Sequence, residues 1–375
     1  MTTPTAGMVL APQEMVRYLL RRGLISPATI VDNDLHIVDT SRRNCNLAVT
    51  TERGRSYLLK QGLGEQSAMT VAHEALVYRY LAELPGTERL ERYLPRCHDF
   101  DAATGVLVLE LLPDALNLRE HAYRRRRCSV RLARELGRAL AALHGCDVHR
   151  LHHQAGLSLP GGQPWALWAD RPTLATYRNA TSATIEASRA IQRYPGGQAA
   201  LAELRATWRP SVLIHGDLRW DNCLAHRRRP GDRTDLKLID WEFADLGEPG
   251  WDIGSVLSEY LMLWLSSMPI TGRSAAEFVE LSTFPLHRVQ PAACAFWDGY
   301  ARYAALAPDT AAELQVRSIR FAGARLLHRA IERVKEMNEL DPFTIALLQV
   351  AQNVLDRPAA AGRHLLGLST PLEAT

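Results

Sequence analysis

The sequence lacks closely spaced cysteines. Its six cysteines are scattered over 375 residues with no Cys-x-x-Cys pair, so neither a zinc ribbon nor a disulfide framework is indicated. It also lacks a cationic N-terminal segment followed by an apolar block, which argues against a signal peptide. The most apolar stretch, 256–265, contains Ser258 and Glu259 and is too short to span a bilayer. We therefore expect a cytoplasmic protein with no membrane partner.

A surplus of charge of one sign is missing as well. The chain has 44 Lys and Arg against 41 Asp and Glu, a net charge of +3, and no basic motif interleaved with aromatic residues. Nucleic acid is therefore not an expected partner. The absence of a Gly-x-x-x-x-Gly-Lys-Ser/Thr motif argues against a P-loop enzyme. Hydrophobic residues make up 47% and charged residues 23% of the chain, which is typical of a globular protein.

Hydrophobic periodicity divides the chain into an N-terminal lobe, 1–112, and a C-terminal lobe, 113–375. In the first lobe it predicts a helix over 13–22 and a mostly antiparallel sheet with one internal helix over 67–84. The predicted strands of this sheet are 35–39, 47–51, 56–60, 96–100 and 106–112. The second lobe is predicted to be mainly helical, with helices over 130–143, up to 193, 199–208, 254–265 and three between 291 and 355. The pattern therefore indicates an α+β, bilobal fold with its hinge at 113–118.

The most informative segment is 212–224, in which three apolar residues lead into His-Gly-Asp, ending at Asp217. Asn222 follows five residues later, and a second apolar strand ends at Asp240. Two strands that deliver carboxylate and amide oxygens favour a site for a hard cation. Phosphoryl transfer needs such a cation on the phosphates and an oriented nucleophile. We therefore predict Asp217 as the catalytic base toward an acceptor hydroxyl, and Asn222 and Asp240 as ligands of the Mg²⁺ that accompanies ATP.

The first lobe is expected to supply a cation for the phosphates. Lys60 ends an apolar strand, so its long stem emerges from the core toward that role. A buried lysine needs a carboxylate partner. Glu74 on the following helix is the predicted partner, and Glu65, in the predicted loop before that helix, is the alternative. A solvated lysine on the strand surface is the competing interpretation of Lys60.

Together these residues resemble the aminoglycoside phosphotransferase family of the protein-kinase-like fold. The resemblance is carried by His215-Gly216-Asp217 with Asn222 and by Ile239-Asp240-Trp241-Glu242. Three weaker pieces match in order, at 108–113, 136–144 and 248–252. The match covers about residues 39–263. It implies a kinase that moves the γ-phosphoryl group of ATP to a hydroxyl with the help of Mg²⁺.

The resemblance also implies roles for residues away from the metal. Backbone groups of Glu110 and Leu112 would bind adenine at the hinge. His215 and Asp252 would support the catalytic loop structurally. These roles are inferred only from the positions that match the family.

One departure from the family concerns the phosphate loop. The expected glycine-rich loop is replaced by 39–46, which contains no glycine. Ser41 and Asn46 match family positions. A polar turn without glycine can still present backbone amides to phosphates. Arg42 or Arg43 would add charge-assisted contacts.

A group of histidines and two runs of arginines can each be interpreted without a functional site. The spacing of a histidine group fits no familiar zinc pattern, so structural or solvent roles are expected. Its members are His144, His149, His152 and His153. The arginine runs 124–127 and 227–229 are solvated loops in the simpler interpretation. In the functional one, Arg227 and Arg228 bind an anionic acceptor.

The acceptor is predicted from the net charge and from a further resemblance, not from a motif. The slight positive charge argues against a polycationic antibiotic. The helix 16–23, the loop 42–44 and the strand end 58–62 resemble stand-alone kinases of thioamitide and class V lanthipeptide pathways. That resemblance implies phosphorylation of Ser or Thr in a ribosomal precursor peptide, with a partner lyase that eliminates phosphate to leave dehydroamino acids. A small-molecule hydroxyl (of a sugar, an amino alcohol or an antibiotic) is the alternative acceptor, and a pseudokinase scaffold is the alternative of another class.

Overall fold

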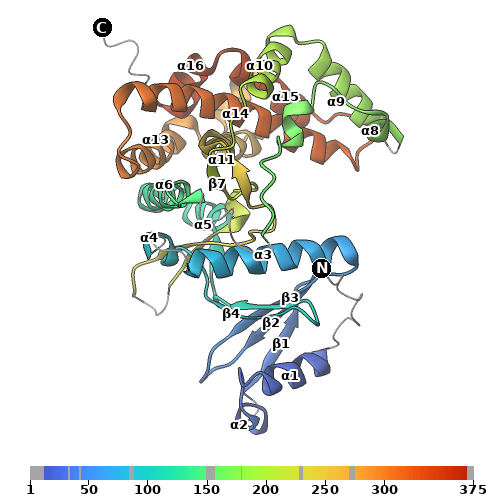
Figure 1. Cartoon of the computed structure of the whole chain (residues 1–375). Coiled ribbons are helices and arrows are strands. Elements are labelled where there is room, and N and C mark those ends of the chain that lie inside the picture. The colour runs from blue at the N-terminus through green and yellow to red at the C-terminus, as the bar shows by residue number, and fades with distance from the viewer. Residues whose placement is uncertain are drawn as a thin grey trace. The chain divides into compact units, whose positions relative to one another are not determined.

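The computed structural model describes residues 12–32, 34–41, 44–83, 88–148, 157–178, 180–227, 231–269 and 275–369. They divide into two compact units. The first unit comprises the described parts of 1–116, 149–158 and 224–244, and the second those of 117–148, 159–223 and 245–375. Residues 224–244 therefore pack with the N-terminal part of the chain. Figure 1 labels the helices and strands of both units.

The first unit is built on a five-stranded antiparallel sheet of order β1-β2-β3-β5-β4. The strands are β1 (His36–Asp39), β2 (Cys45–Thr50), β3 (Tyr57–Gln61), β4 (Cys97–Asp101) and β5 (Val106–Glu110). Each predicted strand is present to within two residues at every end. With the mainly helical second unit, the sheet confirms the α+β fold.

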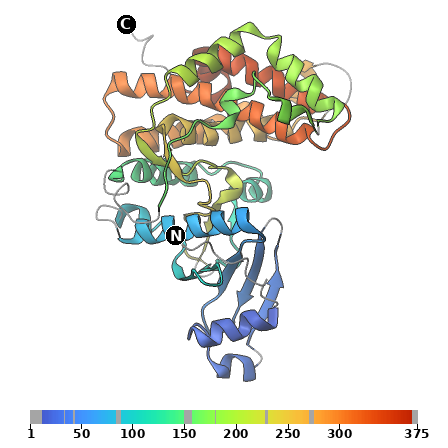
Figure 2. The same ribbon diagram turned by 45° about the vertical axis from the view of Figure 1, so that its right-hand side comes forward.

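Side chains alternate between the two faces of this sheet. Helix α1 (Pro12–Arg21) packs Met15, Tyr18 and Leu19 against one face, where Leu59 of β3 is also buried. Helix α3 (Glu65–Glu83) contacts β3, β4 and β5. Figures 1 and 2 show α1 and α3 on opposite sides of the sheet. Because Lys60 follows Leu59, it points to the α3 side.

Shorter elements complete the first unit. They are α2 (Pro27–Val31), α4 (Glu88–Glu91), β8 (Cys223–His226) and β9 (Asp235–Leu238). Adjacent strands β8 and β9 lie in a small sheet. The N–H of Leu238 donates to the carbonyl of Tyr93, and Lys237 Nζ donates to the carbonyl of Leu94 at 2.8 Å. These bonds fix the end of β9, from which the chain continues to Asp240.

The second unit is mainly helical. Its helices are α5 (Leu118–Arg125), α6 (Val130–His144), α8 (Leu174–Arg178), α9 (Ser182–Gln192), α10 (Pro195–Ala206), α11 (Pro249–Ser266), α12 (Ala275–Glu280), α13 (Leu286–Tyr303), α14 (Pro308–Val334), α15 (Pro342–Asp356) and α16 (Pro358–Ala361). The short turns are η1 (Trp165–Trp168), η2 (Trp220–Asn222) and η3 (Gly362–Leu366), and the strands are β7 (Val212–Ile214) and β10 (Asp245–Gly247). Strand β6 (Leu116–Asn117) lies where the chain passes from one unit to the other.

The core of this unit surrounds α11, which is buried along nearly its whole length. Helix α14 packs against α11 and α15, while α13 packs against α6. The last pair is unusually close: a Cβ at Gly137 would collide with the backbone of α13, and one at Gly299 with the backbone of α6. Glycine at both positions is therefore required for this approach. Among the described residues, no helix is both long and apolar enough to cross a membrane.

Three local predictions are corrected by the structure. Helix α11 begins at Pro249 rather than at residue 254, because proline fits the first helical position and starts the helix there. Arg124 and Arg125 form the last turn of α5 rather than a loop, with Arg126 in a left-handed conformation as the cap. Glu65 is the first residue of α3 and not part of the preceding loop.

Candidate active site

Lys60 and Glu74 form a buried ion pair in the first unit. The Lys60 Nζ atom lies 3.0 and 3.1 Å from the two carboxylate oxygens of Glu74. Glu74 is 1% exposed and Lys60 8%. Lys60 Nζ also donates to Asp240 Oδ1 at 2.8 Å. The pairing predicted with Glu74, rather than with Glu65, is therefore present.

The charges of this group stabilise one another. Burial by itself would lower the pKa of Lys60, but the carboxylates of Glu74 and Asp240 outweigh it and hold the pKa well above its ordinary value. Burial raises the pKa of Glu74, and the ammonium of Lys60 offsets part of that effect. Lys60 is thus a fixed cation at neutral pH.

Asp240 has an unusual backbone. Its φ angle is +69°, in the left-handed region that residues other than glycine seldom adopt. The next residue, Trp241, is fully buried, and its backbone N–H lies 3.4 Å from Glu74 Oε1. Burial of Trp241 therefore holds the strained conformation, and such strain is found preferentially at functional sites. The side chain of Asp240 remains 34% exposed, so solvent still reaches it although it is bonded to Lys60.

Thr40 and Ser41 are hydrogen-bonded to Asn46, within the glycine-free stretch 39–46. Asn46 N–H donates to Ser41 Oγ at 3.0 Å, and Thr40 N–H donates to the Asn46 carbonyl at 2.8 Å. The side-chain oxygens of Asn44 and Asn46 are buried without a hydrogen-bond partner in the described part of the chain. Ser41 and Asn46 are thus brought together, whereas Arg42 and Arg43 lie outside the described residues.

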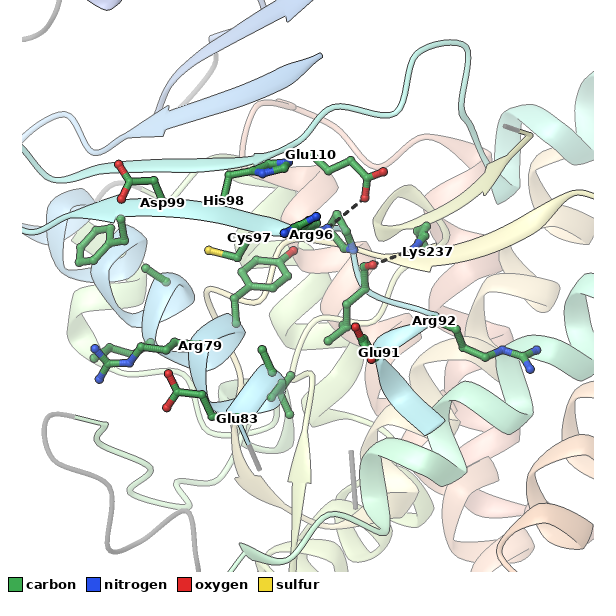
Figure 3. A pocket seen from close by; sticks show the side chains of 18 residues that line it. Arg79, Glu83, Glu91, Arg92, Arg96, Cys97, His98, Asp99, Glu110 and Lys237 are labelled. Atoms are coloured by element: carbon green, nitrogen blue, oxygen red, sulfur yellow. Dashed lines mark hydrogen bonds between the residues drawn. The ribbon is translucent and has the colours of Figure 1, made fainter. Parts of the chain in front are cut away.

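Glu110 and Leu112 lie at the end of β5. The N–H of Glu110 donates to the Arg96 carbonyl at 2.8 Å, and its carboxylate accepts from the Arg96 N–H at 3.0 Å. Leu112 is buried. Figure 3 shows Glu110 beside Arg96 at the wall of a cavity of about 930 Å³, which α3, α4 and β4 also line. Lys60 does not line this cavity, so the cavity is separate from the charged group around Lys60.

The loop that carries Asp217 follows β7, which pairs with β10. His215 is fully buried, and Gly216 has a φ of +80°, a conformation that favours glycine. Asp252, in the first turn of α11, accepts hydrogen bonds from the N–H groups of His215 at 2.7 Å and Gly216 at 3.1 Å. Trp251 Nε1 donates to the Gly216 carbonyl at 2.9 Å. The start of α11 therefore holds the backbone that presents Asp217.

Two arginines hold the carboxylate of Asp217. Arg325 on α14 donates to Oδ1 at 2.9 Å, and Arg219 Nε lies 3.1 Å from Oδ2. Burial alone would raise the pKa of Asp217, but the two guanidinium groups outweigh it and lower that pKa below its ordinary value. Asn222 Nδ2 donates to the Asp217 carbonyl at 2.9 Å. That bond leaves the Asn222 side-chain oxygen as the atom suited to a cation.

Arg219 and Arg325 were not predicted as site residues. Arg219 was within reach of sequence reasoning, because it lies two residues after Asp217 on the same loop. Arg325 carries a weaker signal, a single cation in an apolar stretch of α14, where its side chain is 3% exposed. Nothing in its neighbourhood along the chain indicates a carboxylate more than one hundred residues away.

The next residues are the histidine group and the second arginine run of the sequence analysis. His144 is buried at the end of α6, where its ring contacts the Tyr300 hydroxyl at 3.0 Å and Asp252 at 3.5 Å, a structural role. His149, His152 and His153 lie outside the described residues. Arg227 is exposed and donates to Thr234 Oγ1 at 2.9 Å. Arg228 lies outside the described residues, as does Arg229.

Replacing Asp252 with asparagine is expected to lower the free energy of unfolding by about 2 kcal/mol, because charged acceptors make the stronger hydrogen bonds to buried N–H groups. Urea denaturation measures the change. Asp309→Asn is the matched control, since Asp309 is also in the first turn of a helix but is exposed. An Asp252→Asn variant as stable as the Asp309→Asn control would show that the loop does not depend on this carboxylate.

A family model described as the phosphotransferase enzyme family matches residues 38–292. That range includes both the Lys60–Glu74–Asp240 group and the loop that carries Asp217 and Asn222. No curated protein matches the sequence.

Several solved structures share the fold. The choline kinase of Cryptosporidium parvum aligns at a TM-score of 0.56 and 13% identity, over 95% of this chain and 98% of its own. An amicoumacin kinase in complex with AMP-PNP, Ca²⁺ and Ami aligns at 0.51 and 14% identity, over 92% and 96%. A choline/ethanolamine kinase family protein of Mesorhizobium loti aligns at 0.50 and 18% identity, over 94% and 97%. At these identities the likeness shows the fold alone.

Proposed function

The chain belongs to the phosphotransferase enzyme family, and from that premise we propose that it transfers the γ-phosphoryl group of ATP to an acceptor hydroxyl with Mg²⁺ as cofactor. The observation that carries this proposal is the state of Asp217. Asp217 lies on a loop whose backbone N–H groups, those of His215 and Gly216, donate hydrogen bonds to Asp252. The lowered pKa of Asp217 keeps its carboxylate ionised. An ionised, oriented carboxylate is what phosphoryl transfer requires of the protein.

In the proposed reaction the acceptor hydroxyl donates a hydrogen bond to Asp217. The acceptor oxygen forms a bond to the γ-phosphorus as the bond to the bridging oxygen breaks, which leaves ADP. The proton of the hydroxyl passes to the Asp217 carboxylate. Because the pKa of Asp217 is lowered, its main contribution before proton transfer is to orient the hydroxyl. Lys60 neutralises charge on the α- and β-phosphates.

The residues present fit a hard cation. Asn222 offers its side-chain oxygen, because its nitrogen is bonded to the Asp217 carbonyl. Asp240 offers a partly exposed carboxylate. Oxygen donors of this kind, completed by phosphate oxygens and water, suit Mg²⁺. When bound, the ion would withdraw negative charge from the phosphates.

The nucleotide contacts in this proposal come from the matched family positions. Glu110 and Leu112 would bind adenine through their backbone, and Ser41 and Asn46 would contact the phosphates. We keep residues 1–112 as the proposed nucleotide-binding lobe and 113–375 as the catalytic and acceptor-binding lobe. Arg227 and Arg228 stay candidates for acceptor contacts, with Arg227 exposed to solvent.

A small-molecule hydroxyl is the acceptor we favour, since the structural neighbours are named as kinases of choline and amicoumacin. A second candidate is Ser or Thr of an acidic precursor peptide, followed by elimination through a partner lyase. The exposed arginines 124–127 at the end of α5 favour that candidate. Mass spectrometry separates the two by showing which acceptor gains a phosphoryl group. A scaffold without turnover conflicts with the intact set Asp217, Asn222 and Asp240.

Removal of divalent cations is expected to lower acceptor-dependent ADP release at least about a hundredfold, because a metal ion contributes several kcal/mol of charge stabilisation. ADP release is measured with ATP and a panel of hydroxyl acceptors, first in excess EDTA and then after Mg²⁺ is restored. Equal rates with and without EDTA would contradict the metal-dependent reaction. No ADP release with any acceptor in Mg²⁺ would contradict the enzyme itself.

A further inference from the structure

Asp217 has no carboxylate oxygen free of arginine. Oδ1 accepts a hydrogen bond from Arg325 at 2.9 Å, and Oδ2 lies 3.1 Å from Arg219 Nε. The proposed reaction requires one of these oxygens for the acceptor hydroxyl. The acceptor hydroxyl must therefore share a carboxylate oxygen with an arginine or take the place of one.

Arg325 is buried and contacts three side chains, those of Asp217, Trp251 and His328. Its side chain is 3% exposed, and its guanidinium lies 5.2 Å from the ring centre of Trp251. A second guanidinium nitrogen lies 3.0 Å from His328 Nδ1, one turn along α14. Displacing Arg325 from Asp217 would leave a buried cation without its counter-charge, which is strongly unfavourable. Arg325 is thus the fixed partner of Asp217.

Arg219 is held less firmly. Its side chain is 29% exposed and comes from the loop before η2 rather than from a long helix. Its Nε atom is buried, yet it makes no well-directed hydrogen bond to any described residue, so its contact with Asp217 is ionic only. Arg219 is therefore the more easily displaced of the two arginines.

The other carboxylates near Arg219 have partners of their own. Glu259 is 2.6 Å from Arg119, which also lies 3.6 Å from Asp221. Glu332 is 3.3 Å from both Arg329 and His328. These three carboxylates also attract Arg219, but each has an ion pair with another cation.

We propose that Arg219 is the specificity-determining residue for the acceptor, and that it binds a carboxylate carried beside the reacting hydroxyl. Binding draws Arg219 from Asp217 Oδ2 and leaves this oxygen for the hydroxyl, while Arg325 keeps Oδ1. The preferred substrates are then hydroxy acids and hydroxy amino acids rather than amino alcohols. A guanidinium suits this role because it pairs with a carboxylate through two parallel hydrogen bonds. The inference rests on the proposed function.

Matched acceptors that differ by one carboxylate test the inference. The pairs are serine with ethanolamine, and homoserine with 3-aminopropan-1-ol. The wild type is expected to show a kcat/KM at least about tenfold higher for the carboxylate member of each pair, since a hydrogen bond to a charged group contributes that much or more. Arg219→Gln is expected to remove this preference by raising KM for the carboxylate member of each pair more than for the member without a carboxylate. Arg302→Gln, an exposed arginine on α13, is the control and should behave as the wild type.

A binding measurement keeps the inference separate from the enzymatic reaction. Calorimetric titration with serine and homoserine needs no turnover, so it reports on Arg219 even if no ADP is released. At least tenfold weaker binding to Arg219→Gln than to the wild type supports the inference. Equal binding, or no binding to the wild type, overturns it. It is also overturned if Arg219→Gln lowers acceptor-free ATP hydrolysis together with turnover of both members of a pair, because Arg219 would then serve the transferred phosphoryl group.

Discussion

An Asp217→Asn variant is expected to lose at least about a thousandfold in kcat while its affinity for ADP changes less than about twofold, since a positioned base contributes up to about ten-thousandfold. Asparagine retains an oxygen that can accept the bond from Arg325, so the loop keeps its shape. What it cannot do is attract and then accept the proton of the acceptor hydroxyl. The rate of ADP release at saturating acceptor measures the loss, and calorimetry measures ADP affinity.

The variant must be shown to be folded, because Arg325 is buried and loses its counter-charge. Urea denaturation at neutral pH provides that test. Asp298→Asn on α13 is the matched control, since that carboxylate is 52% exposed and only weakly paired with Arg302. The control should keep its full rate. A folded Asp217→Asn variant that retains a tenth or more of the wild-type kcat would rule out Asp217 as the base.

The parts of this site that could be predicted from sequence are those set by short-range patterns. Side chains alternate along β3, so Lys60 lies on the face opposite to that of Leu59. Helix α3 follows β3 directly, and Glu74 is only 14 residues from Lys60 in the sequence. In the same way, the apolar residues before His215 indicate a strand, and Asp217 is predicted to lie in the loop just after it.

The parts that could not be predicted depend on contacts far apart in sequence. Arg325 meets Asp217 only because α14 packs against α11, whose first turn also holds the catalytic loop. The apolar stretch around Arg325 indicates that this arginine is buried, but nothing on α14 indicates that its partner is Asp217. The start of α11 differs from the predicted one for a simpler reason. Pro249 occupies the first helical position, five residues before the predicted start, so Asp252 lies in the helix.

Replacing Lys60 with methionine is expected to lower the free energy of unfolding at pH 7 by about 3 to 5 kcal/mol, because it leaves a buried charge without its partner. Glu74 is 1% exposed and has both oxygens on Lys60. Asp240, the other carboxylate on Lys60, is partly exposed and can turn to water. Urea denaturation measures the loss. Lys335→Met, an exposed lysine, should change stability by no more than about 0.5 kcal/mol.

The deficit of Lys60→Met is expected to depend on pH. Burial raises the pKa of Glu74 even with Lys60 present, and loss of the ammonium raises it further. A carboxyl whose pKa is higher in the folded state stabilises the fold below its unfolded pKa of about 4.3, and that contribution is lost as pH rises through the folded value. The deficit should therefore shrink toward pH 4 and grow toward neutrality. In the double variant Lys60→Met/Glu74→Gln the neutral amide removes the unpaired charge, so stability is partly regained and the deficit no longer grows toward neutrality. A deficit that is the same at pH 5 and pH 8, or that persists unchanged in the double variant, would show that the pair does not act as a coupled unit.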